Sequence, residues 1–168
     1  PALYTAIEVF AGNGVDVLIH QGHRYTPTPV ISHAILTFNR DHPQIQADGV
    51  VISPSHNPPE DGGFKYNPPN GGPADTSTTR WVQNRANQII ANGLKDVRRM
   101  PLNRAMAAST TTQIDLITPY LKDLENVIDM KAIADSGIHI GVDPLGGSGV
   151  AYWEPMAEMY GLNMKVVN

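Results

Sequence analysis

The sequence predicts an α/β fold, and three observations support this prediction. Apolar segments of strand length alternate along the chain with amphipathic segments of helix length. Clusters of glycine, proline and asparagine separate these segments. The composition of the 168 residues, 41% hydrophobic and 17% charged, is typical of a globular protein.

The first part of the chain follows a helix, strand, helix, strand order. Residues 2–10 carry apolar side chains at helical spacing, and Gly12-Asn13-Gly14 ends that helix. Residues 15–19 form an apolar strand, and Pro27-Thr28-Pro29 opens a helix that continues to Phe38. Residues 49–52 are again apolar and strand-like. This alternation predicts a parallel sheet.

A loop rich in proline and glycine follows, since residues 54–73 hold six prolines and four glycines. A short strand over residues 64–66 is expected within it. Asp75, Thr76 or Ser77 can then cap a helix that ends at Asn92-Gly93. Trp81 lies on the apolar face of this helix, and Trp153 lies on that of a later one, so both are expected in the core.

The remaining segments predict a second α/β unit. Residues 93–111 are expected to form a linker with one short helix over 102–107, which divides the chain into domains at 1–92 and 112–168. Helices are expected over 113–127, with Pro119 as an irregularity, and over 130–134; a strand is expected over 138–143, followed by a helix with Tyr152 and Trp153 and by a final strand over 164–167. The chain begins without methionine and stops after a strand, so we expect a piece of a longer protein, truncated at both ends.

Charge and cysteine content exclude several classes of function. The formal net charge is -4, and the basic residues are scattered, which disfavours nucleic acid and anionic membranes as partners. The absence of cysteine excludes disulfides, thiolate metal sites and a cysteine nucleophile. There is neither a secretory signal nor an apolar run long enough to span a bilayer, so we expect a cytoplasmic protein.

The most informative motif is Ser53-Pro54-Ser55-His56-Asn57-Pro58, directly after the predicted strand 49–52. The ends of strands in α/β proteins commonly carry reactive groups, and this motif places a hydroxyl there. Lys65 lies ten residues after Ser55 and is a cation that could stabilise charge on a phosphoryl group or exchange protons. The alternative is a tight loop in which serine and asparagine bond to their own backbone.

The motif and its flanks, residues 61–67 and 70–73, resemble the active-site serine loop of the α-D-phosphohexomutases, in particular the bacterial phosphoglucomutase branch. The resemblance implies three-layer α/β/α domains, with 1–92 from the later part of domain 1 and 112–168 from the early part of domain 2. It implies an intramolecular phosphotransferase that interconverts α-D-glucose 1-phosphate and glucose 6-phosphate. Ser55 would be the phosphoserine, Lys65 would stabilise charge or carry a proton, and His56 would lie beside the phosphoserine.

The resemblance also implies Mg²⁺, bound in part by the phosphate on Ser55, and glucose 1,6-bisphosphate as intermediate. Three family motifs have no counterpart in the 168 residues: an Asp-x-Asp-x-Asp metal loop, a Gly-Glu-x-Ser-Gly sugar loop and an Arg-x-Ser-Gly-Thr phosphate clamp. We therefore expect the isolated chain to be inactive and to self-associate through uncovered strand edges. Ser53 stands where many members have threonine, and Pro54 where alanine is frequent.

Alternatives to this function stay open. One is a phosphomannomutase or phosphoglucosamine mutase; another is a non-catalytic regulatory phosphoprotein of the same fold. Residues 146–149, a glycine turn before a helix, could cradle a phosphate, but close packing of strand against helix is the simpler interpretation. His20 and His23 are expected to be loop histidines, since no third metal ligand accompanies them.

Overall fold

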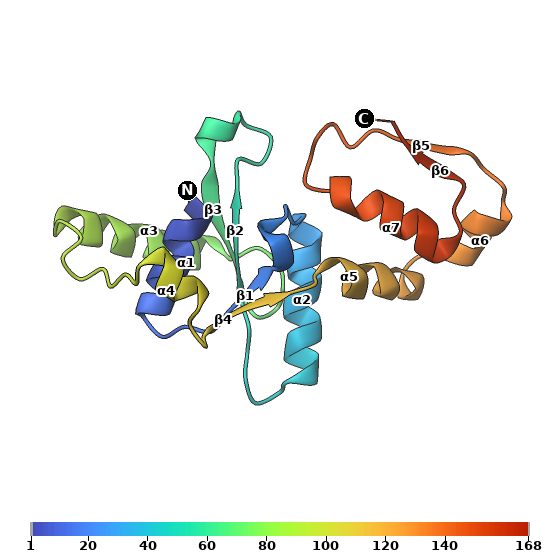
Figure 1. Cartoon of the computed structure of the whole chain (residues 1–168). Coiled ribbons are helices and arrows are strands. Elements are labelled where there is room, and N and C mark those ends of the chain that lie inside the picture. The colour runs from blue at the N-terminus through green and yellow to red at the C-terminus, as the bar shows by residue number, and fades with distance from the viewer. Residues whose placement is uncertain (1, 168) are drawn as a thin grey trace. The chain divides into compact units, whose positions relative to one another are not determined.

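The computed structural model describes residues 2–167 as a mixture of helices and short strands (Figure 1). Internal contacts divide these residues into two compact units, one formed by residues 2–19 and 35–114 and the other by residues 20–34 and 115–167. The α/β class predicted from the sequence is confirmed. The described strands pair two by two, as β1 with β4, β2 with β3 and β5 with β6.

The core of the first unit forms where α1 (Ala2–Gly12) packs against α4 (Leu102–Met106). The same unit contains most of β1 (Val17–His20) and its partner β4 (Thr111–Ile114). The buried apolar side chains of this cluster are Ile7, Ala11, Ile19 and Ala105. Their burial removes apolar surface from water, which is the main source of stability for so small a core.

The segment before α4 runs along α1. The Met100 amide donates to the carbonyl of Glu8 at 2.9 Å, and Arg99 forms an ion pair with the Glu8 carboxylate. At Gly12, an added Cβ would lie 3.0 Å from the backbone of Arg98, which is tighter than most Cβ contacts, so glycine favours this close approach. Residues 98–106 therefore pack on the first unit, and the contacts change from one unit to the other at 114/115. The expected domain division at residues 93–111 stays a prediction.

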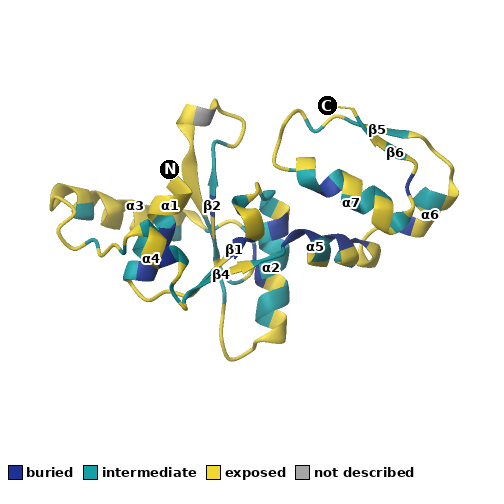
Figure 2. Cartoon of the chain, in the orientation of Figure 1, coloured by how far each residue is buried: buried dark blue, intermediate teal, exposed yellow. Residues whose placement is uncertain are grey.

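The first unit also contains β2 (Gly49–Ser53), η2 (Pro59–Asp61), β3 (Gly63–Asn67) and α3 (Thr76–Ala91). The Asp75 carboxylate accepts a hydrogen bond from the Thr78 amide and caps α3, as the sequence predicts. No residue of α3 is buried, and the helix is mostly exposed in Figure 2. The expectation that Trp81 lies in the core is wrong for this structure, because its side chain is 69% exposed.

The second unit contains η1 (Gln21–His23), the first half of α2 (Thr28–Asp41), and then α5 (Ile117–Asp123) and η3 (Leu124–Asn126). It continues with α6 (Met130–Asp135), β5 (Ile140–Val142), α7 (Val150–Tyr160) and β6 (Met164–Val166). Strands β5 and β6 are parallel and α7 connects them, which is the βαβ arrangement that alternating elements predict. The buried apolar side chains of this unit are Val30, Leu116, Ile117, Leu121, Leu124, Met130, Tyr152 and Leu162.

Three expectations for this part of the chain need correction. The helix predicted from residue 113 begins only at Ile117, because Thr111–Ile114 is strand β4 and the Asp115 carboxylate accepts hydrogen bonds from the first helical amides. Pro119 lies in the first turn of α5, where its missing N–H costs nothing, so it is not an irregularity. His20 was expected in a loop but is the buried last residue of β1, and its Nδ1 accepts from the Leu116 amide at 3.3 Å.

No helix among residues 2–167 combines the length and the apolarity needed to cross a membrane.

Candidate active site

An antiparallel hairpin supports the predicted serine motif. Strands β2 and β3 pair in register from Gly49 opposite Asn67 to Ser53 opposite Gly63. Residues 54–62, here called the serine loop, connect the two strands at the last pair (Figure 1). The ladder of backbone hydrogen bonds fixes both ends of the serine loop, so the loop begins and ends at defined positions.

Ser55 lies in the first turn of the serine loop, where the Asn57 amide donates to the Pro54 carbonyl at 3.0 Å. Its backbone has φ +59°, a left-handed conformation that residues other than glycine seldom adopt. The Ser55 amide donates to Oγ of Ser53 at 2.9 Å. Ser55 is exposed. The sequence-predicted phosphoryl carrier is thus presented to solvent on a constrained turn.

His56 and Lys65 lie on different parts of the same hairpin. His56 follows Ser55 in the turn and is exposed. Lys65 lies on β3 directly opposite Val51, two positions from the Ser53–Gly63 pair. Residues opposite one another in an antiparallel pair share a face, so Lys65 and Ser53 are on the same face, at a diagonal spacing of about 7–8 Å. The hairpin therefore places Lys65 on the same face as Ser53, near the end of the hairpin where the serine loop begins.

Polar side chains hold the far end of the hairpin. The Tyr66 hydroxyl donates to Asp48 at 2.8 Å, and this hydrogen bond raises the pKa of the Tyr66 phenol. Asn67 is buried and donates to the Gly71 carbonyl at 3.0 Å. Asn39 of α2 donates to the carbonyls of Ala47 and Pro69, each at 2.9 Å. These contacts connect the segments before β2 and after β3, so they stabilise the end of the hairpin opposite the serine loop.

The structure adds one residue to the predicted site, namely Ser53. From the sequence alone, its hydroxyl is only a replacement for the threonine of many family members. The hydrogen bond from the Ser55 amide makes Ser53 part of the turn itself. The Ser-x-Ser spacing is the available signal, because serine hydroxyls commonly bond to backbone groups two residues away.

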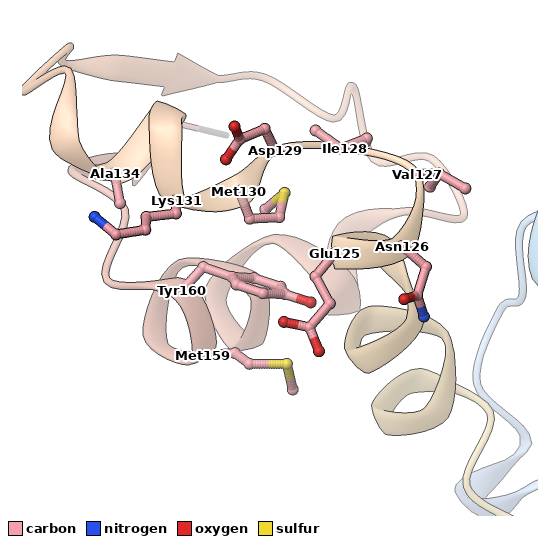
Figure 3. Close-up of a pocket in the computed structure, with 10 residues that line it drawn as sticks. All are labelled: Glu125, Asn126, Val127, Ile128, Asp129, Met130, Lys131, Ala134, Met159 and Tyr160. Atoms are coloured by element: carbon pink, nitrogen blue, oxygen red, sulfur yellow. The ribbon is translucent and has the colours of Figure 1, made fainter.

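A pocket of about 650 Å³ lies elsewhere in the chain, within the second unit. Figure 3 shows Tyr160 and Met159 of α7 below the α6 residues Met130 and Lys131, with Glu125 beside the Tyr160 ring. None of its lining residues belongs to the serine loop. The pocket and the serine loop are therefore separate features.

The residues present do not form a complete metal site. Among residues 2–167, no group of three or more histidine, aspartate or glutamate side chains is placed to hold a metal ion. The aspartate-rich motif expected from the resemblance also has no counterpart in the sequence.

An exposed serine on a strained turn at a strand end, with a lysine on the paired strand, defines a candidate phosphoryl-transfer site in an α/β protein. The family model for phosphoglucomutase/phosphomannomutase, alpha/beta/alpha domain I, matches residues 1–92, which include Ser55, His56 and Lys65. The chain belongs to this family.

Individual relatives agree with this assignment. A phosphoglucomutase of Komagataeibacter xylinus is 56% identical over 168 residues, which are 100% of this chain and 30% of that protein. A phosphoglucomutase of Schizosaccharomyces pombe is 30% identical over 79% of this chain and 24% of its own length. A phosphoglucosamine mutase of Prochlorococcus marinus (strain SARG) is 28% identical over 84% of this chain and 27% of its own length.

A solved structure shows the same fold. The crystal structure of a Thermus thermophilus protein described as a phosphomannomutase superposes with a TM-score of 0.67 at 24% identity. The match covers 93% of this chain and 31% of that chain. The chain thus spans less than a third of the length of each of these relatives.

Proposed function

We propose that the protein carrying this chain is a phosphoglucomutase that interconverts α-D-glucose 1-phosphate and glucose 6-phosphate. One observation carries the proposal: the 56% identity to a phosphoglucomutase extends over the whole chain. The site geometry supports it, because the serine that would carry the phosphoryl group is exposed at the end of the β2–β3 hairpin. A phosphate monoester of serine suits such a carrier, since it hydrolyses very slowly without catalysis.

In the proposed cycle, the phosphoryl group leaves Oγ of Ser55 as its P–O bond breaks and a bond forms to O6 of glucose 1-phosphate. The O6 hydroxyl loses its proton and Oγ of Ser55 gains one in the same transfer, which leaves Ser55 with a neutral hydroxyl. Glucose 1,6-bisphosphate then reorients, its O1–P bond breaks, and the phosphoryl group returns to Oγ of Ser55. The Ser55 hydroxyl loses its proton in this step and O1 gains one, which gives glucose 6-phosphate. We assign to Lys65 the stabilisation of charge on the transferring group, or the transfer of the proton, because it is the cation on the adjoining strand. We place His56 beside the phosphoserine as a neighbour of the transferring group.

Magnesium would supply electrostatic stabilisation of the phosphoryl group when it is bound. In this proposal, the chain contributes only the phosphate on Ser55 to the magnesium site. The isolated 168-residue chain should therefore bind Mg²⁺ weakly and show no turnover. A tight, stoichiometric magnesium isotherm measured by calorimetry on the isolated chain would contradict this part of the proposal.

The test of the function is the turnover of the full-length protein on three sugar 1-phosphates, those of glucose, mannose and glucosamine. The proposal predicts the highest kcat/KM for glucose 1-phosphate and its loss in the Ser55→Ala variant. A preference for mannose 1-phosphate or glucosamine 1-phosphate would replace this proposal with one of the other mutases. Absence of turnover on all three, with phosphate added to Ser55 by a kinase, would identify a regulatory phosphoprotein.

We further infer that small hexose phosphates are the partners and that the protein is cytoplasmic. For the isolated chain we infer self-association, because apolar strand residues are uncovered: Phe64 of β3 is 66% exposed and Leu18 of β1 is 47% exposed. Light scattering at several protein concentrations tests this inference. A sharp monomer peak that does not change with concentration would contradict it.

A further inference from the structure

Ser53 makes a contact that bears on the chemistry of Ser55. It is the last residue of β2, paired with Gly63 across the hairpin, and it is partly buried. Its Oγ lies 2.9 Å from the Ser55 amide nitrogen and accepts that hydrogen bond. The contact joins the paired end of β2 to the backbone of the exposed serine.

The backbone of Ser55 needs such support. Its φ of +59° is the left-handed conformation, which is unfavourable for a residue with a Cβ. Two hydrogen bonds restrain the turn: the Ser55 amide to Ser53 Oγ, and the Asn57 amide to the Pro54 carbonyl. Only the first involves a side chain, so only the first can be removed by mutation without changing the backbone.

We propose that Ser53 is a positioning residue for phosphoryl transfer: by accepting the Ser55 amide, its hydroxyl holds Ser55 in the left-handed conformation that presents Oγ to the sugar phosphate. This inference rests on the proposed function. The physical basis is preorganisation, because a nucleophile held in the reactive geometry loses little entropy at the transition state. Without the acceptor, Ser55 spends part of its time in ordinary conformations that direct its hydroxyl elsewhere.

The chain contains a matched control for this contact. In the loop after β5, Asp143 Oδ1 accepts the amide of Leu145 at 2.9 Å, and Leu145 has φ +52°. The spacing, the donor and the backbone conformation are the same as at Ser53 and Ser55. An Asp143→Ala substitution thus removes a hydrogen bond of the same type from a loop outside the proposed site.

The experiment uses the full-length protein with Ser53→Val and Ser53→Thr. These two side chains have the same shape and similar strand propensity, and only threonine keeps the hydroxyl. The first-order rate constant of phosphoryl transfer from glucose 1,6-bisphosphate to Ser55 is measured in a single turnover. We expect a fall of about five- to tenfold for Ser53→Val, the effect of losing one ordinary hydrogen bond. Ser53→Thr should restore the rate to within about twofold of wild type, and Asp143→Ala should leave it unchanged.

A merely structural role for Ser53 predicts a different pattern. The single-turnover rate constant refers only to folded molecules, so a variant that is less stable but correctly positioned keeps the wild-type rate. Equal rate constants for Ser53→Val and Ser53→Thr would therefore overturn the inference. Amide exchange at Ser55 gives a second readout: it should be faster in Ser53→Val than in Ser53→Thr, and equal exchange would also contradict the proposal. If wild-type protein accepts no phosphate at Ser55, the proposed function fails and this inference fails with it.

Discussion

Two loops of this chain, each following a strand, share one backbone conformation and differ in the side chain that is placed at it. The serine loop after β2 and the glycine loop after β5, residues 143–149, each place a non-glycine residue at positive φ. In both, a side-chain oxygen two positions earlier accepts the amide of that residue, at 2.9 Å. The strained residue is Ser55 in one loop and Leu145 in the other, and both are exposed.

The continuation of the chain also differs. The serine loop returns directly into β3, so its two ends are held by one antiparallel hairpin. The glycine loop instead leads into α7 and then into the parallel strand β6. Turn geometry alone therefore does not define a reactive site. The hydroxyl at the strained position, with a lysine on the paired strand, distinguishes the serine loop.

The largest expected effect separates the two strained residues. Ser55→Ala in the full-length protein removes the only oxygen that could carry the phosphoryl group in our proposal, and kcat should fall more than about 1,000-fold. Leu145→Ala is the matched control, because it shortens the equivalent side chain of the other loop, and kcat should not change. Steady-state kinetics on purified, folded variants measures both. A Ser55→Ala variant with near wild-type turnover would remove the distinction between the loops.

The second-largest loss of kcat is expected on substitution of Lys65. Lys65→Met keeps the length of the side chain and removes its charge, so stabilisation of the transferring phosphoryl group is lost. We expect kcat to fall about 100-fold, with a smaller change in KM. Lys131→Met is the control, because Lys131 is an exposed lysine of α6 that pairs with Asp135. Equal losses in the two variants would point to a general charge effect and not to a role of Lys65 in the site.

The region around α7 should respond to alkaline pH. Burial raises the pKa of Tyr152 to about 12, above its ordinary value of 10.0. Between these values the unfolded chain has lost the proton that the folded chain keeps, so the stability contributed by the protonated phenol is present below pH 10 and is lost as pH rises towards 12. Thermal unfolding from about pH 9 to about pH 12 should show a decline of several degrees that is smaller in Tyr152→Phe. An identical decline in both proteins would contradict the assignment.

The smallest expected effect concerns the strain itself. Leu145→Gly relieves the left-handed conformation at an exposed position, although glycine also increases the entropy of the unfolded chain. The two terms leave a net stabilisation of about 0.5–1 kcal/mol, which urea denaturation measures as a shift in midpoint. Phosphoryl transfer to Ser55 should stay at the wild-type rate. A destabilised variant would show that Leu145 makes contacts worth more than the strain.

The sequence predicted the type and order of most elements because their local signals are strong. Asp75 caps α3, Gly14 adopts a positive φ after α1, and the apolar run before Ser53 forms β2. The motif around Ser55 was also visible, since its residues are contiguous. Features that depend on distant pairing were not predicted. Strand β4 is polar and short, and only its pairing with β1 defines it.

Trp81 shows the same limit of prediction from sequence, because it lies on an apolar helix face and is nevertheless exposed. Helical periodicity identifies an apolar face but not whether another segment covers it. The contact between Ser53 and Ser55 was missed for a different reason. A hydroxyl near the end of a strand has several possible partners, and the choice depends on the backbone conformation of Ser55.

The measurement that tests the central claim most directly is the location of phosphate after the full-length protein is incubated with glucose 1,6-bisphosphate and Mg²⁺. Peptide mass spectrometry would be applied to wild type, to Ser55→Ala and to the isolated chain. Our account predicts one phosphate on Ser55 in wild type, none at that position in Ser55→Ala, and none in the isolated chain. A folded wild-type protein that turns over glucose 1-phosphate without phosphate ever reaching Ser55 would contradict it.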